Sequence, residues 1–137
     1  MNRIVVGYDG SEPARRALDR AVELADAAVV AVVCAADVSP LVRDPAGGAS
    51  PIDPAHEEAR GAALAEARQH LEGKGVEAVY VAGVGHPADV IVEEAKETGA
   101  DLIVVGTRGL NAAKRIVLGS VSTNVVHHAP CDVLVVR

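Results

Sequence analysis

The sequence predicts an α/β fold: one doubly wound domain in which a five-stranded parallel sheet carries four helices, distributed over both faces. Short β-branched runs alternate with longer Ala-rich segments of helical periodicity along the 137 residues. Half of the residues are hydrophobic but only 1% are aromatic, so Val, Leu, Ile and Ala must build the core, as in a sheet buried on both faces. Such alternation gives parallel strands joined by right-handed crossovers, and the length favours a single domain over residues 1–137.

Five strands are expected, because five short runs combine β-branched residues with flanking turn-forming residues. They are RIVVGYD (3–9), VVAVVCA (29–35), VEAVYVA (76–82), DLIVVG (101–106) and DVLVVR (132–137).

Four helices are expected between the strands, because apolar residues recur there at helical spacing. Their apolar stripes cover residues 14–25, 64–71, 88–95 and 120–129, and Ser11 is a suitable N-cap for the first. The segment 36–55 (ADVSPLVRDPAGGASPIDPA) contains four prolines and a Gly-Gly pair, so a long loop is expected there. A lid over a ligand and a loop without function both remain open for it.

Charge and composition exclude several classes of function. The net charge of -6 and the pI near 5.3 argue against broad binding of nucleic acids or anionic membranes. The sequence has no apolar run of membrane-spanning length, and its start, MNRIVVGYDG, does not resemble a signal peptide. Two cysteines, Cys34 and Cys131, do not suggest a disulfide framework, so we expect a reducing cytoplasmic environment.

The segment GTRGLNAAKRIVLGS (106–120) is the strongest candidate for a binding site. Ligands of doubly wound sheets bind beyond the carboxyl ends of the strands, and this segment follows the fourth expected strand. It carries three basic residues and no acidic one, within a glycine-rich stretch that ends at the start of a helix. Glycine-rich loops and helix N-termini expose backbone N–H groups, so the pattern favours a phosphate site. It is not a Walker A loop.

The glycines of this segment have the spacing G-x2-G-x9-G-[ST], and on this spacing the chain resembles the universal stress protein family. The similarity extends over nearly the whole chain, through IVVGYDGSEPARRALDRAVELA, GVGHPADVIVEEAKETGADLIVVGTRG and LGSVSTNVVHHAPCDVLVVR. The resemblance implies the strand order 3-2-1-4-5 and an adenine nucleotide ligand, ATP in most members of this branch, with or without Mg²⁺.

The resemblance also implies a set of binding residues. Asp9 matches the acid that approaches the adenosine or a metal-bridged phosphate, Ala35 the position beside the adenine edge, and Gly85 the glycine beside the ribose. The residues that match the phosphate loop are Gly106, Gly109, Gly119, Ser120, Val121 and Ser122.

Three other signals carry less weight. GVGHPA (83–88) fits a dinucleotide motif, but the following strand lacks the acid that such a fold requires. HHAPCD (127–132) contains metal-binding residue types, but adjacent histidines on a helix point to different sides. His86 stands beside the expected site, where a lone histidine is usually solvated.

Three functions follow from these residues. The first is a cytoplasmic, ATP-binding stress or regulatory protein that acts as a homodimeric sensor or binding module. The second is a nucleotide-independent dimer that works through protein contacts. The third is a slow ATP hydrolase with Asp9 acting on bound metal, although the sequence shows no second acid to position water. The dimer is expected through residues 132–137, because this apolar edge strand lacks Lys, Pro or a bulge to protect it.

Overall fold

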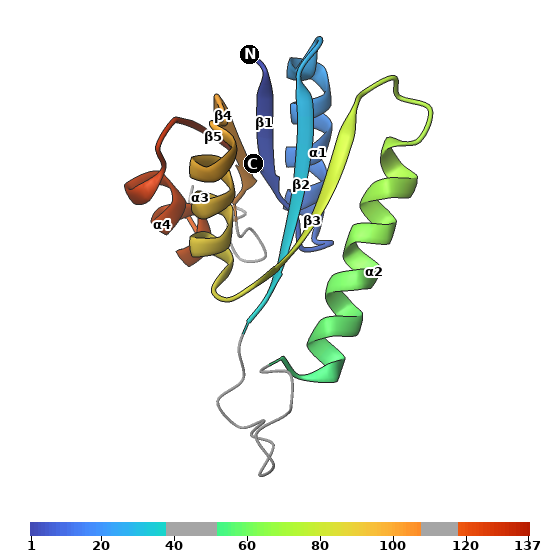
Figure 1. Ribbon diagram of the computed structural model, residues 1–137, viewed down its shortest axis with the longest axis vertical. Helices are drawn as coiled ribbons and strands as arrows, with labels where there is room; N and C mark the ends of the chain where they lie inside the picture. The colour runs from blue at the N-terminus through green and yellow to red at the C-terminus, as the bar shows by residue number, and fades with distance from the viewer. Residues whose placement is uncertain (38–51, 108–117) are drawn as a thin grey trace.

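The computed structural model describes residues 1–37, 52–107 and 118–137. Within these ranges five strands alternate with four helices (Figure 1). In chain order they are β1 (Arg3–Gly7), α1 (Glu12–Ala25), β2 (Val29–Ala36), α2 (Pro54–Leu71), β3 (Ala78–Val84), α3 (Pro87–Thr98), β4 (Leu102–Gly106), α4 (Ser120–His128) and β5 (Asp132–Val136).

The strands form one parallel sheet in the order β3-β2-β1-β4-β5, which confirms the predicted fold class and strand order. The chain moves outward from β1 through β2 to β3, and then crosses to the other side of β1 to form β4 and β5. The winding therefore reverses between β1 and β4. Sheets of this class bind their ligands at such a reversal, on the side of the carboxyl ends.

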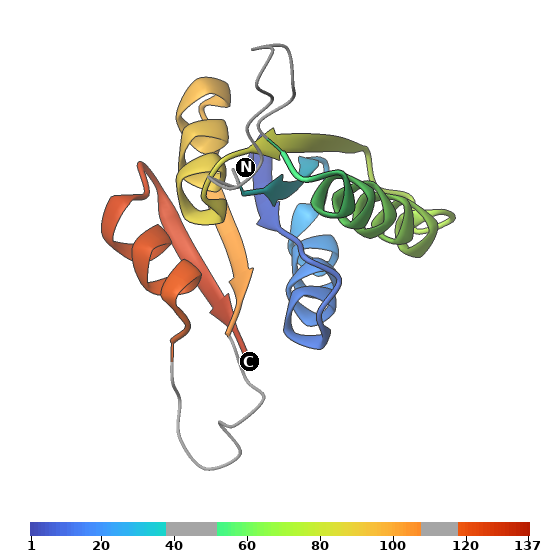
Figure 2. The same cartoon turned by 90° about the horizontal axis from the view of Figure 1, so that it is seen from below.

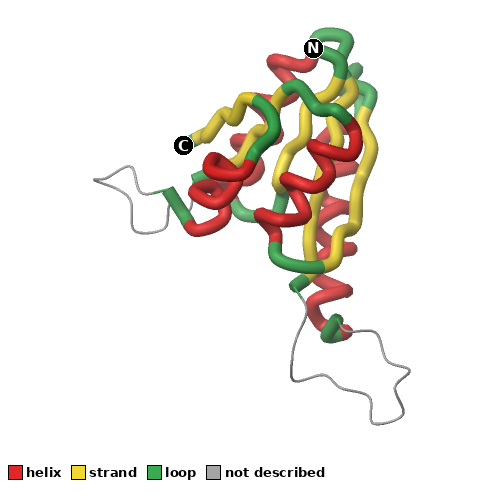
Figure 3. Tube along the Cα trace, turned by 60° about the vertical axis from the view of Figure 1, so that its left-hand side comes forward, coloured by secondary structure: helices red, strands yellow, loops and turns green. Residues whose placement is uncertain are grey.

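The helices form two layers, with α1 and α2 on one face of the sheet and α3 and α4 on the other (Figures 2 and 3). Successive residues of β1 point to opposite layers: Ile4 and Val6 pack with α1 and α2, and Val5 packs with α3 and α4. All three are fully buried. Each such side chain contributes roughly 1.5–3 kcal/mol to the free energy of unfolding through its burial. Because its side chains enter both layers, β1 belongs to both cores.

The helices begin and end at residues suited to those positions. Ser11 caps α1 as predicted, because its Oγ accepts a hydrogen bond from the backbone N–H of Ala14 (3.3 Å). Asp53 caps α2 in the same way, accepting from the N–H of Ala55 (2.8 Å). Gly99 ends α3 with a φ of 62°, a left-handed conformation that glycine adopts without steric cost.

Some boundaries differ from the predicted ones. The expected loop 36–55 is shorter at both ends, since Ala36 belongs to β2 and α2 begins at Pro54. Proline is acceptable there because the first helical N–H has no intrahelical partner. β3 lies two residues later than expected and follows β2 in register from Val30–Ala78 to Ala36–Val84.

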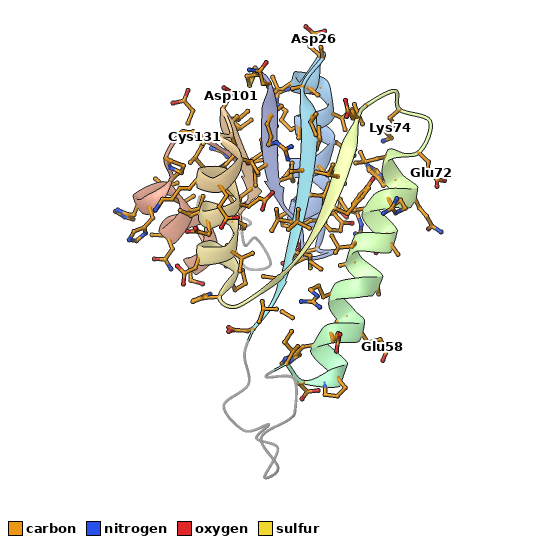
Figure 4. All side chains as sticks on the ribbon, viewed as in Figure 1. Asp26, Glu58, Glu72, Lys74, Asp101 and Cys131 are labelled. Atoms are coloured by element: carbon orange, nitrogen blue, oxygen red, sulfur yellow. The ribbon has the colours of Figure 1, made fainter. Side chains whose placement is uncertain are left out.

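At the amino ends of the strands, the side chain of Asp101 (Figure 4) bonds to the backbone at the start of β1. Its Oδ2 accepts hydrogen bonds from the backbone N–H groups of Asn2 (2.6 Å) and Arg3 (3.0 Å). These bonds lower the pKa of the Asp101 carboxyl. None of the helices described is both long and apolar enough to cross a membrane.

Candidate functional site

A cleft of about 270 Å³ opens at the carboxyl ends of β1, β2 and β4, where the winding reverses. This volume lies just below the roughly 300–1,000 Å³ typical of small-molecule sites. The lining residues are Gly7, Tyr8, Asp9, Ser11, Pro13, Ala14, Val33, Cys34, Ala35, Pro87, Ile91, Val105, Gly106, Thr107, Gly119, Val121 and Ser122.

One wall of the cleft is apolar and closely packed. Val33, Ile91 and Val105 belong to the core between the sheet and α3, and they reach the cleft from three different elements. A β-carbon on Gly7 would lie 2.6 Å from Cδ1 of Ile91, so glycine is needed there for α3 to approach β1. A wall of this kind suits a flat apolar group such as a nucleobase.

The N-terminus of α4 faces the cleft without a side-chain cap. Its N-cap is Gly119, which has no side chain to accept from the first-turn N–H groups, and Gly119, Val121 and Ser122 all line the cleft. The hydroxyl of buried Ser122 donates to the carbonyl oxygen of Gly119 (3.1 Å), which also accepts from the N–H of Thr123 (2.9 Å), so this hydroxyl does not cap the first-turn N–H groups. Free N–H groups and the helix dipole together make such an end suitable for an anion.

The N-terminus of α1, which also lines the cleft, differs because it has a side-chain cap and fewer free donors. Ser11 caps it, and Pro13 has no N–H group to offer. Asp9 stands beside it and accepts a hydrogen bond from the N–H of Ser11 (2.9 Å). An exposed carboxylate at this rim can accept from ligand hydroxyl groups or coordinate a cation, and it disfavours a phosphate at this end.

Two further lining residues, Tyr8 and Cys34, are uncharged at neutral pH. Burial and the hydrogen bond that the Tyr8 hydroxyl donates to Glu66 (2.6 Å) raise the pKa of Tyr8 to about 12. Burial and the nearby negative charge of Asp9 raise the pKa of the Cys34 thiol to about 11. Asp9 therefore carries the one negative charge among the described residues that line the cleft.

The structure brings together six of the residues expected at the site. Asp9, Ala35, Gly106, Gly119, Val121 and Ser122 line the cleft, and Ser120 is the first residue of α4. Gly85 lies outside the cleft, between β3 and α3, where its φ of 126° requires glycine and its N–H donates to the carbonyl of Ala36 (2.9 Å). Gly109 lies outside the described residues, as do the three basic residues Arg108, Lys114 and Arg115.

The other signals of the sequence have structural positions of their own. Gly83 of the GVGHPA stretch lies in β3 against Val90 of α3, and His86 precedes the first residue of α3. His127 and His128 form the last turn of α4, where a ring nitrogen of His128 lies 2.9 Å from the carbonyl oxygen of Asn124.

Sequence reasoning did not name Tyr8, Cys34, Ile91 or Thr107 as site residues. Tyr8, Cys34 and Thr107 stand at the ends of strands, the positions that this fold directs to the ligand, so strand position was the available signal. Ile91 reaches the cleft from within a helix. The sequence offers no signal for its contact, because that contact depends on how α3 packs across β1.

The comparisons with known proteins agree with this architecture. The model of the universal stress protein family matches residues 1–137. Universal stress protein YxiE of Bacillus subtilis is 35% identical over 146 residues, which cover 99% of each chain. A crystal structure of a universal stress protein in complex with cAMP is 31% identical, with a TM-score of 0.74 over 99% of this chain and 97% of that one. The universal stress protein of Archaeoglobus fulgidus in complex with dAMP is 26% identical, with a TM-score of 0.77 over 100% of this chain and 98% of that one.

Proposed function

Since this chain belongs to the universal stress protein family, we propose that it binds an adenine nucleotide in the cleft between β1 and β4 and acts as a sensor or binding module in a stress response. The observation that carries the proposal is the uncapped N-terminus of α4, which faces the cleft at the reversal of the sheet, across from an apolar wall. The relatives in complex with cAMP and dAMP support the choice of an adenine nucleotide.

The chemistry of the walls supports one orientation for the proposed ligand. The adenine lies against the apolar wall near Val33 and Ala35, and the ribose hydroxyls approach the carboxylate of Asp9. The phosphates extend to the first turn of α4, on the side of the cleft away from Asp9. Their negative charge meets the positive end of a helix there and avoids the one carboxylate among the described lining residues.

ATP is the proposed nucleotide, with or without Mg²⁺. This finer choice rests on the resemblance of residues 106–120 to the G-x2-G-x9-G-[ST] signature, of which Gly106, Gly119 and Ser120 are described. In the proposed orientation the phosphates lie away from Asp9, so we expect a metal bound with the triphosphate to be held by phosphate oxygens and water, not by this carboxylate. With no second carboxylate among the described lining residues to orient water, we expect binding to be the function and hydrolysis to be slow.

Thermal unfolding with added nucleotides tests the proposal. A ligand at about 100 times its Kd adds about 2.7 kcal/mol to the free energy of unfolding. ATP, AMP and cAMP, each with and without Mg²⁺, should raise the Tm, whereas the same concentrations of UTP should not. Absence of a shift with every adenine nucleotide would favour the nucleotide-independent dimer instead. Mass spectrometry of protein denatured straight after purification would identify a nucleotide that co-purifies.

The proposal includes a homodimer in the cytoplasm. β5 is an edge strand of the sheet, and its apolar residues 133–136 contain no charge or proline that would block pairing with a second copy. Cys34 and Cys131 are both free thiols, which suits a reducing compartment.

A further inference from the structure

A groove separate from the nucleotide cleft lies between the other edge strand, β3, and the outer side of α3. Its volume is about 470 Å³. Val81, Gly83 and Val84 of β3 form its floor together with Val90 of α3. Figure 2 shows β3 as the outermost strand on its side of the sheet. Val79 and Val84 are 37% and 51% exposed, so apolar surface of β3 is open to solvent along the strand.

One wall of this groove is acidic. Four carboxylates from α3 line it. Among the described lining residues, only His86 belongs to a basic residue type. Ion pairs between described residues connect α1, α2 and the turn after α2, and none of them involves this wall. The four carboxylates thus repel one another without an ion pair of their own among the described residues, although the guanidinium of Arg60 on α2 donates to the carbonyl oxygen of Gly83 (2.7 Å), which also lines the groove. The four carboxylates are Asp89, Glu93, Glu94 and Glu97.

The free edge of β3 offers backbone hydrogen bonds beside that wall. The carbonyl of Glu77 accepts from the N–H of Val30, and the N–H of Gly85 donates to Ala36, so odd-numbered residues bond to β2. The even-numbered residues in between direct their N–H and C=O groups outward. β3 contains no charged residue and no proline, the features by which edge strands normally avoid pairing with other chains.

We propose that β3 and the acidic wall of α3 form a docking surface for an extended segment of a partner protein that carries Lys or Arg at alternate positions. The segment pairs with the outward N–H and C=O groups of Ala82 and its even-numbered neighbours, adding a strand to the sheet. Side chains of a strand alternate between faces, so every second residue reaches the α3 side and meets the carboxylates. Main-chain bonds give affinity and the basic residues give specificity.

A second copy of this chain does not suit the surface. Pairing two β3 edges would bring two acidic walls together, and like charges at an interface disfavour association. A single wall and a basic segment are complementary, and the chain's net charge of -6 adds long-range attraction for such a partner. The groove is thereby distinguished from β5, whose residues 133–136 carry no charge.

The first test uses a fluorescein-labelled synthetic peptide that alternates Lys and Val, with its binding to the full chain followed by fluorescence anisotropy. We expect saturable binding that weakens as salt increases. A block peptide of the same composition, with all Lys before all Val, should bind at least about tenfold more weakly, because it cannot present basic residues on one face of a strand. Equal binding of both peptides, or no binding of either, would overturn the proposal.

Charge-reversal variants locate the surface. Glu94→Lys with Glu97→Lys should weaken binding of the alternating peptide at least about tenfold. The matched control is Glu57→Lys with Glu58→Lys, which changes the net charge equally on α2, away from α3 (Figure 4). This control should retain binding to within about twofold. An equal loss in both double variants would mean attraction to overall charge alone, and would refute a docking surface at α3.

The pairing itself is tested at Ala82. Ala82→Pro removes an outward N–H on an edge strand, where proline is tolerated, whereas Ala82→Ser keeps it. The proline variant should lose binding and the serine variant should retain it. Amide hydrogen exchange of the unmodified chain provides a measurement that needs no variant: the peptide should protect the N–H groups of Ala82 and Val84. Unchanged exchange at both would rule out strand pairing.

Discussion

The backbones of Gly106 and Pro13 lie so close together that no side chain fits between them. A β-carbon built on Gly106 would lie 2.5 Å from both the carbonyl carbon and the carbonyl oxygen of Pro13. Real β-carbons essentially never approach other atoms so closely, and a backbone neighbour cannot rotate away. Gly106 ends β4 and Pro13 lies in the first turn of α1, so this contact joins two elements at the mouth of the cleft.

Gly106→Ala should therefore destabilise the fold whether or not a nucleotide is present. We expect the free energy of unfolding to fall by about 1–3 kcal/mol, the usual cost of overpacking. Gly61→Ala is the matched control, since a β-carbon on Gly61 in α2 would contact nothing within 4 Å. That control should be neutral or stabilising by up to about 1 kcal/mol. Urea unfolding of both variants provides the comparison, and equal stabilities would contradict the packing role of Gly106.

This contact also marks the limit of what residue patterns could predict. Periodicity located all five strands and four helices, because apolar residues must repeat with the period of the element that buries them. The strand order was implied by the family resemblance. The same resemblance assigned Gly106 to phosphate binding, and it gave no sign that the packing of α1 against β4 also requires glycine there. No local pattern reports such a contact.

In the candidate site, too, some features could be predicted from the sequence and others depend on long-range packing. The family resemblance implied Asp9 and Gly119, and the structure places both along the cleft, each next to the end of an element. The raised pKa values of Tyr8 and Cys34 were not predictable, because they depend on burial and on groups distant in sequence, such as Glu66 for Tyr8. The displacement of β3 has a similar cause: its boundaries follow its pairing with β2, not its own composition.

Gly119 allows helix stability to be separated from phosphate binding. Its φ of −67° and ψ of 169° are open to any residue, and they match the usual conformation of an N-cap. Gly119→Asp should cap α4 but place a negative charge where the phosphates are proposed to lie. We expect the Tm to stay the same or rise, and ATP affinity to fall at least about tenfold.

Gly119→Asn is the matched control, since it has the same shape and caps α4 without the charge. It should reduce ATP affinity less than the aspartate does. Isothermal titration calorimetry with ATP on both variants distinguishes the two effects. Wild-type affinity in Gly119→Asp would refute the N-terminus of α4 as the phosphate site.

Tyr8 makes stability depend on alkaline pH. Its pKa is raised in the folded state from 10.0 to about 12, so the neutral hydroxyl is favoured by folding. This stabilisation is complete below pH 10 and is lost as the pH rises from 10 to about 12, because the unfolded chain releases the proton first. Tyr8→Phe should remove that part of the pH dependence and lower stability at pH 7 by about 1–2 kcal/mol, since Glu66 loses the Tyr8 donor and keeps only that of Arg15.

The two tyrosines can be titrated separately by tyrosinate absorbance, since the chain has no tryptophan and Tyr8→Phe leaves Tyr80 alone. Urea unfolding of both proteins between pH 7 and pH 11 then tests the linkage. If the difference in stability between wild type and Tyr8→Phe does not change with pH, the pKa of Tyr8 is not raised.

Cys34 can report on occupancy of the cleft. Its raised pKa leaves little thiolate at pH 8, so Cys34 should react slowly with a disulfide reagent and faster as the pH approaches 11. Bound ATP should slow this reaction further, because Cys34 lines the cleft. The variant Cys131→Ser isolates the rate of Cys34, and Cys34→Ser isolates that of Cys131. Protection of both thiols by ATP, or of neither, would argue against a nucleotide in this cleft.

The last prediction concerns β5 and the proposed homodimer. Val133 and Val135 pack against the core on the α3 and α4 side, and Leu134 and Val136 against the core on the α1 side, so each face of this strand is partly buried. Its outer edge is different. The N–H of Thr107 donates to the carbonyl of Val136, so the even-numbered residues bond to β4 and the odd-numbered ones direct their N–H and C=O groups outward. A second copy that pairs antiparallel across a twofold axis would satisfy these groups.

Val135→Pro removes one of those outward N–H groups without touching the bonds to β4, so it should convert the dimer to a monomer while each chain stays folded. Val135→Thr keeps the N–H and a β-branched side chain, and it should remain dimeric. Light scattering at micromolar concentration gives the mass of each, and circular dichroism checks the fold. A monomeric wild type, or a proline variant that remains dimeric, would mean that β5 is not the interface. If β5 alone mediates association, the Glu94→Lys, Glu97→Lys variant at α3 should remain dimeric in the same measurement, which separates this edge from the docking surface at β3.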